Sequence, residues 1–359
     1  MASAEELDPE DKEAQIRAEL KKGSWFDKEK HPSIRKRARN LEFEYIDSGG
    51  SWTYQDWRNH QSWSRYFKDF YRPKHMLSSV FQELPLIVLV VLVTVFAALY
   101  YDLYQTKAPG RLVLVSTGYF QPYFYLVIPL SLLLVFKTQV SYSRWWEARI
   151  SFGDQQISLR NAARLVVAWI WPQDKKLGED IVRLLAVLAP ASGVLFRHEV
   201  APLEANKDLL SDREMRYVLG CDQPPVAVGA MISRLLVTAP IETFERVIIE
   251  EHLAQFMSTL SVLGRLSSQP LYLTYTRNAI RNLLMFLLGL PFALYEYMGW
   301  ATMPAVLVTT LLCATIENTA TQIENPLLVL PVTTLTTNTR QHVEATLASR
   351  VALEDLENI

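Results

Sequence analysis

Residues 119–149 read YFQPYFYLVIPLSLLLVFKTQVSYSRWWEAR, and this stretch decides the fold. It carries no charge before Lys137, so a helix formed by its first part is long enough to cross the hydrocarbon core of a membrane. The apolar part runs directly into residues 141–149, where aromatic and charged side chains stand together. Such residues are typical of a membrane–water interface. The stretch therefore predicts an integral membrane protein.

Three further apolar stretches have the length of a membrane crossing. Residues 84–101 are uncharged, and as a helix rising ~1.5 Å per residue they extend over roughly 27 Å, close to the ~30 Å hydrocarbon core. Residues 279–298 and 301–317 are separated only by a short break at Gly299-Trp300, which predicts an antiparallel helical hairpin. With residues 119–139 they make four predicted crossings. No long alternating pattern indicates a strand, so the expected fold class is an all-α integral membrane protein.

The segment between the second and third crossings, about 146–278, has a different pattern. It places apolar residues at helical spacing and mixes them with Arg, Glu and His, which predicts helices that lie beside the membrane. Basic residues flank the first two crossings on one side, whereas the loop between them holds only Lys107 and Arg111. By this charge rule, both termini and the helical segment lie on the cytosol-equivalent side.

Composition excludes several other classes of protein. The formal net charge of −2 gives no reason to expect a nucleic-acid partner, which would usually show as a basic stripe. Cys221 and Cys313 are the two cysteines and allow no disulfide framework, which favours a reducing compartment. The acidic N-terminus resembles neither a secretory signal nor a transit peptide. The six His residues lack metal-ligand spacing, and no phosphate loop, Gly-x-Gly-x-x-Gly or Gly-x-Ser-x-Gly motif is present. We expect no enzyme, cofactor or metal site.

One stripe of the second crossing draws attention. Ile128, Leu132 and Phe136 follow one another at four-residue spacing and so share one side of a helix. An apolar stripe of this kind ordinarily faces lipid or a neighbouring helix. Here it ends at the polar residues Lys137 and Gln139, and cations within a membrane usually face protein or water. From spacing alone, both interpretations stay open.

Two groups of residues carry a resemblance to a known family. The stretch from Ile128-Pro129-Leu130-Ser131 through residues 144–149, RWWEAR, resembles the pore helix and signature of the bestrophin family of anion channels. Residues 323–326, Ile-Glu-Asn-Pro, resemble a second motif of that family. The resemblance covers roughly residues 60–350. It is closest to the plant branch, the thylakoid voltage-dependent chloride channels.

The resemblance implies a homopentamer with one central pore for chloride or similar monovalent anions. The second crossing would line the pore, with Ile128, Leu132 and Phe136 as its narrow neck. Rings of apolar side chains gate by narrowing or dewetting, and an aromatic ring turns a positive edge toward an anion. Lys137 would add positive charge beside the neck, and Arg160 and Arg164 would line a wider vestibule beyond it. The implied location is the chloroplast thylakoid membrane, with both termini in the stroma.

The signature residues are expected to have a structural role. Glu147 is placed to pair with Arg144 or with a neighbouring helix, while two Trp side chains anchor the helix end at the interface. Asn325 and Pro326 are followed by apolar residues where animal bestrophins carry the acids that help to bind calcium, so we expect no calcium gate. The complete structural signature is Arg144, Trp145, Trp146, Glu147, Arg149, Asn325 and Pro326.

Alternatives remain at this point. Bacterial relatives can prefer cations, a secondary anion transporter would also cross the membrane repeatedly, and a membrane scaffold would need no pore. The expected organisation is a mobile N-terminal segment (1–50), a bestrophin-like channel (51–350) and a C-terminal tail (351–359). Residues 1–40, with a basic run at 35–39, are either a disordered tail or a segment that plugs the inner mouth.

Overall fold

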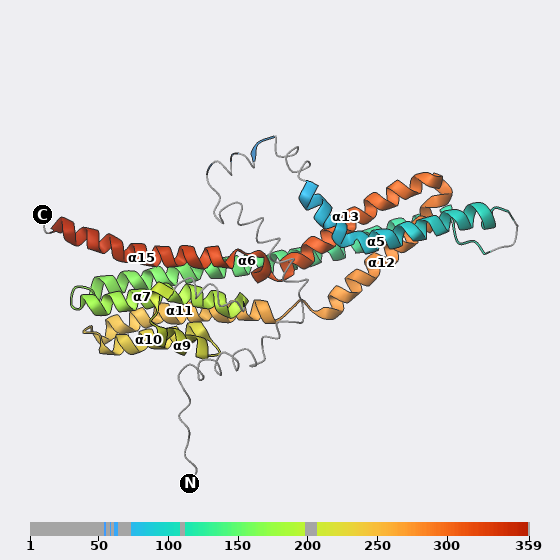
Figure 1. Ribbon diagram of the computed structural model, residues 1–359. Helices are drawn as coiled ribbons and strands as arrows, with labels where there is room; N and C mark the ends of the chain where they lie inside the picture. Colours follow the sequence, from blue (N-terminus) through green and yellow to red (C-terminus); the bar gives the residue numbers. More distant parts are fainter. Residues whose placement is uncertain are drawn as a thin grey trace, which may run out of the picture. The chain divides into compact units, whose positions relative to one another are not determined.

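The computed structural model describes residues 54, 58, 61–63, 73–107, 112–197 and 207–357. The predictions for residues 1–50, including the mobile segment and the plug, lie outside the described residues. Within the described part the chain is helical and has no strand, in agreement with the expected all-α class. Figure 1 shows the order of the helices. The chain divides into two compact units.

The first, which we call the apolar unit, comprises residues 51–147 and 268–326. Three helical stretches of the described residues are long and apolar enough to cross a membrane, at Glu83–Gln105, Thr117–Trp169 and Leu273–Glu324. The third contains a turn, so these stretches include all four predicted crossings. Their elements are α5 (Pro73–Tyr100) with a π-helical turn (Tyr101–Gln105), a 3₁₀ turn (Thr117–Tyr119) before α6 (Phe120–Trp169), α12 (Leu273–Met298), a 3₁₀ turn (Gly299–Ala301) and α13 (Thr302–Glu324).

Helix α6 differs from the prediction at its inner end. The sequence suggested a crossing at 119–139 and a separate helical region from about 146, but one unbroken helix runs on to Trp169. The apolar pattern gives way to an amphipathic pattern without any Gly or Pro to end the helix there. The point at which the sequence changes from apolar to amphipathic therefore lies inside one helix and not at a boundary between two helices.

The hairpin of α12 and α13 is confirmed. Gly299 has a φ of 55°, a conformation that a side chain rarely tolerates, and it caps the C-terminal end of α12 where the turn to α13 begins. The outer loop before α6 is fastened to the same helix, because the Ser116 amide donates to the carbonyl of Phe292 at 3.2 Å and the Thr117 amide donates to the Glu296 carboxylate. The Tyr295 hydroxyl adds a hydrogen bond to Asp102 at 2.8 Å.

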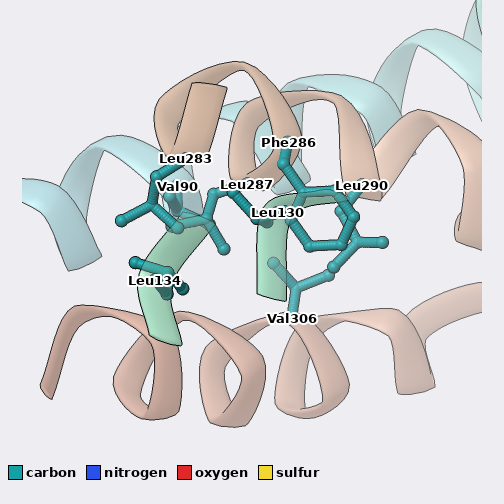
Figure 2. Close-up of a cluster of buried hydrophobic side chains, with 8 residues drawn as sticks. All are labelled: Val90, Leu130, Leu134, Leu283, Phe286, Leu287, Leu290 and Val306. Atoms are coloured by element: carbon teal, nitrogen blue, oxygen red, sulfur yellow. The ribbon is translucent and has the colours of Figure 1, made fainter. Parts of the chain in front are cut away.

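The apolar unit has a core to which all four helices contribute (Figure 2). Since lipid tails are as apolar as leucine, such a core is stabilised chiefly by close packing. Gly289 of α12 shows how close the helices come, because a Cβ there would overlap the Tyr123 hydroxyl of α6. The buried cluster consists of Val90 from α5, Leu130 and Leu134 from α6, Leu283, Phe286, Leu287 and Leu290 from α12, and Val306 from α13.

The second, which we call the amphipathic unit, takes its described residues from 148–267 and 327–357. Residues 268–278, expected to belong to the soluble region, fall instead in the apolar unit. The expected tail at 351–359 is helical as far as Glu357. The elements are the second half of α6, α7 (Lys175–Arg197), a 3₁₀ turn (Lys207–Leu209), α9 (Asp212–Gly220), α10 (Pro224–Thr238), α11 (Thr243–Ser268), α14 (Pro326–Val329) and α15 (Val332–Glu357).

Helix α7 lies at the centre of the amphipathic unit, and α10 and α15 pack against it. Its residues from Leu184 to Ser192 are buried almost without exception. Gly193 faces α15, because a Cβ at that position would stand 3.6 Å from the Thr336 methyl group, in ordinary van der Waals contact. Two ion-pair groups fasten the edges: Arg183 of α7 pairs with Glu214 of α9, and Arg340 of α15 pairs with Asp208 and Glu344.

Candidate pore-lining site

The predicted neck residues Ile128, Leu132 and Phe136 lie on an exposed side of α6. Their exposed fractions within the chain are 65%, 53% and 55%. The opposite side of the same turns is buried, with Leu130 at 8% and Leu134 at 6% in the core of the apolar unit. The spacing thus predicted correctly that the three residues share a face, and that face is exposed within the single chain. Their role as a pore neck stays a prediction.

Lys137 differs from its expected position beside the neck. Its side chain is 0% exposed, and its ammonium forms an ion pair with Glu317 of α13. The ammonium also donates a hydrogen bond of 2.9 Å to the hydroxyl of Thr321. That hydroxyl in turn donates to Glu317 at 3.0 Å. The physical reason for the difference is that an ammonium in an apolar surrounding takes the nearest carboxylate as partner, which directs it into the subunit and away from the exposed stripe.

The sequence carried a signal for this pair. The second and fourth apolar stretches each contain one charged residue near the same end, Lys137 and Glu317. Charges within membrane segments usually pair with one another, so opposite signs at equal depth predict a contact.

Arg144 forms a second connection at the inner end of the apolar unit. Its Nε donates to the carbonyl of Glu324 at 3.0 Å, and its Nη2 donates to the carbonyl of Gln269 at 2.8 Å. The Glu324 carboxylate accepts the amide of Leu271 at 3.0 Å. A single guanidinium on α6 therefore holds the end of α13 and the segment that leads into α12. These contacts favour the predicted structural role and add partners that the sequence did not indicate.

The remaining signature residues lie around this connection. Trp145 forms ring contacts with Tyr142, at 5.8 Å between centroids, and with Trp146, at 6.3 Å. Trp146 and Arg149 are exposed, and Glu147 is half-buried. An anchoring role at a membrane interface suits the exposed indole and remains a prediction.

The second half of α6 carries the predicted vestibule residues. Arg160 and Arg164 are exposed and one turn apart, so they lie on the same side of the helix within the amphipathic unit. Exposed guanidinium groups at this spacing supply positive charge to whatever space that side faces. Whether that space is a pore vestibule remains a prediction.

Asn325 and Pro326 connect α13 to α14. Pro326 begins α14, and the Asn325 side-chain oxygen is buried without a hydrogen-bond partner. Among the residues that the structure describes, no group of three or more His, Cys, Asp and Glu side chains is arranged to hold a metal ion.

Comparison with known proteins connects this arrangement to a family. A family model described as bacterial and fungal bestrophin protein matches residues 57–345. A voltage-dependent anion channel-forming protein of Nostoc sp. is 28% identical over 247 residues, which cover 66% of this chain and 77% of that protein. The chloroplastic voltage-dependent chloride channel 1 of Arabidopsis thaliana is 25% identical over 278 residues, covering 74% and 67%.

Solved structures show the same fold. The crystal structure of a bacterial bestrophin homolog from Klebsiella pneumoniae has a TM-score of 0.65 and 20% sequence identity. The match covers 72% of this chain and 96% of that one.

Proposed function

Since the chain belongs to the bestrophin family, we propose that it is an anion channel that passes chloride or similar monovalent anions down their gradient. The observation that carries the proposal is the exposed apolar stripe on α6. Its three side chains lie opposite the buried core of the apolar unit, so each subunit presents them outward. In a homopentamer with α6 around the axis, each position becomes a ring of five.

The chemistry of the stripe suits a neck. Two aliphatic rings exclude water unless the opening is wide enough to stay wet, which gives a gate without a moving plug. The rings of Phe136 direct their positive edges toward an anion that passes. Because Lys137 is paired with Glu317 inside the subunit, the proposal assigns the positive charge that attracts anions to Arg160 and Arg164. Passive flux needs no catalytic residue.

We further propose the thylakoid membrane of the chloroplast as its place, with both termini in the stroma. Two relatives are named chloroplastic chloride channels, and the basic residues beside the first two crossings favour this orientation. The channel would then adjust membrane potential and ion balance. Immunoblots of separated thylakoid and envelope membranes check the location, and protease digestion of intact thylakoids checks which side carries the termini. A signal confined to the envelope would contradict the proposal.

The decisive experiment is a recording from purified protein in planar bilayers under a chloride gradient. The proposal expects currents that reverse at the chloride equilibrium potential and a detergent particle near five times 41.2 kDa. Reversal at the cation potential would indicate a cation-selective relative. Substrate-saturable flux from a monomer or dimer would favour a secondary transporter, and a particle without flux would favour a scaffold.

The neck assignment has its own test. Phe136→Ala and Leu132→Ala should each raise unitary conductance or open probability, because a methyl group leaves a wider and more easily wetted ring. Val127→Ala is the matched control, since Val127 is also exposed but lies about 100° round the helix from Ile128. Unchanged currents in both neck variants, or an equal effect of the control, would place the constriction elsewhere.

A further inference from the structure

Two polar contacts join α6 to α13 with the same sequence offset. Lys137 contacts Glu317 and Arg144 contacts Glu324, and each pair is 180 residues apart. The contacts are thus seven residues apart on both helices, which is about two helical turns. Equal spacing on both elements means that α6 and α13 run in the same direction and in step. We call Lys137, Glu317, Thr321, Arg144 and the Glu324 carbonyl the register clamp.

The contact between Lys137 and Glu317 allows one position of α6 along α13, whereas packing in the apolar core allows several. Leucine side chains in a core accept other leucine neighbours after a small shift, whereas a buried ammonium needs its carboxylate. Lys137 has no exposed surface, and its two partners Glu317 and Thr321 also hydrogen-bond each other. Moving α6 by one turn, about 5.4 Å, would strand the charge among apolar side chains. Buried polar pairs fix register in this manner in coiled coils.

The clamp lies directly beside the neck. Lys137 follows Phe136 in the chain, so the two side chains leave α6 about 100° apart. A rotation of α6 that turned Phe136 away would pull Lys137 from its partners. The contact between Arg144 and the Glu324 carbonyl opposes the same rotation two helical turns further along α6.

We propose that Glu317 is a positioning residue: by holding Lys137 it fixes the register of α6 on α13, and thereby the direction in which the neck residues point. This inference rests on the proposed function, and it assigns to a residue outside the pore the control of the pore's shape. Thr321 assists by orienting the carboxylate and the ammonium together. Arg144 maintains the same register at the inner end.

Single-channel recording of clamp variants tests the inference. Glu317→Gln removes the carboxylate charge and keeps its shape, and Thr321→Val removes the hydroxyl. Both should change mean open probability on the order of tenfold and add conductance substates, as expected when a second register becomes populated. Thr319→Val is the matched control, because within the described part of the chain the Thr319 hydroxyl bonds only inside α13, to the Thr315 carbonyl at 2.8 Å.

A charge exchange separates positioning from mere structural support. The double variant Lys137→Glu with Glu317→Lys restores an ion pair across the same helices and should recover wild-type conductance levels. A residue needed only for folding would instead lower the yield of assembled particles and leave the surviving channels with wild-type currents. That outcome, for both Glu317→Gln and Thr321→Val, would overturn the inference. If Glu317→Gln does not assemble, Thr321→Val alone decides.

Failure of the clamp and failure of the proposed function are distinguishable. Absence of anion current from the wild-type protein would end the channel proposal. The clamp is then judged by hydrogen exchange, which needs no current: Glu317→Gln should accelerate exchange of the amides at 134–144, and Thr319→Val should not. Equal exchange in wild type and Glu317→Gln would refute the clamp by itself.

Discussion

The ion pair between Arg183 of α7 and Glu214 of α9 has a stability contribution that follows from its geometry. Two parallel hydrogen bonds of 3.0 Å join the guanidinium to the carboxylate. The Ser211 amide adds a third at 2.8 Å. Hydrogen bonding to Arg183 lowers the pKa of Glu214 from 4.5 to about 2. The pKa of Arg183 is raised, chiefly by its hydrogen bonds to Glu214, which agrees in direction.

The pKa difference converts into a free energy of opening α9. Each unit corresponds to about 1.36 kcal/mol, so the upper bound is about 3 kcal/mol. The carboxylate keeps 23% of its side-chain surface exposed, and screening by solvent brings the expected contribution down to about 1–2 kcal/mol. Since the folded-state pKa is the lower one, this stability is fully present above pH 4.5 and is lost as the pH falls toward about 2.

Glu214→Gln isolates the charge, because glutamine at this third helical position can still complete the capping box with Ser211. We expect the α9 amides to exchange with deuterium about 5- to 30-fold faster in the variant at pH 7, measured by mass spectrometry with correction for intrinsic rates. The ratio should shrink through pH 4.5 and approach one near pH 2. Asp222→Asn, an exposed acid in the next loop, should leave α9 unchanged. A ratio near one at pH 7, or one that does not fall with pH, would refute the reasoning.

Three further predictions concern packing, the C-terminal helix and calcium. Gly289→Ala should lower the free energy of unfolding by about 1–3 kcal/mol in detergent, since the new methyl group overlaps Tyr123, whereas Gly153→Ala has open space and should not. Asp208→Asn removes an exposed partner of Arg340 and should lower the free energy of unfolding in detergent by less than about 1 kcal/mol. Calcium chelation should leave wild-type currents unchanged, and a large loss of current would disprove the absence of a calcium gate.

The sequence predicted the elements of the apolar unit well, because length, charge and turn residues are local properties. Gly299-Trp300 marked the hairpin, and four-residue spacing placed Ile128, Leu132 and Phe136 on one side of α6. The continuation of α6 to Trp169 escaped prediction, since its apolar pattern changes to an amphipathic one inside a single helix. Hydropathy averaged along the sequence shows such a change as the end of a membrane crossing, although the helix itself continues.

The position of Lys137 shows what spacing alone does not provide. A helical phase tells on which side a residue lies, but the partner on that side comes from another helix 180 residues away. The charge of Lys137 suggested a role toward the passing ion, while the carboxylate of Glu317 determined its direction. The contacts of Arg144 with two backbone carbonyls were beyond prediction for the same reason, because carbonyl positions depend on the assembled fold.

The packing of α15 on α7 has a consequence for synthesis of the protein. Helix α7 is translated before α15, the partner that covers its Gly193 side, and the hairpin of α12 and α13 is translated between the two. Synthesis of that hairpin therefore precedes completion of the amphipathic unit. Until α15 is made, the side of α7 that it covers lacks this partner. A chain that ends before residue 332 would leave that side uncovered, and exposed apolar surface of this kind favours aggregation.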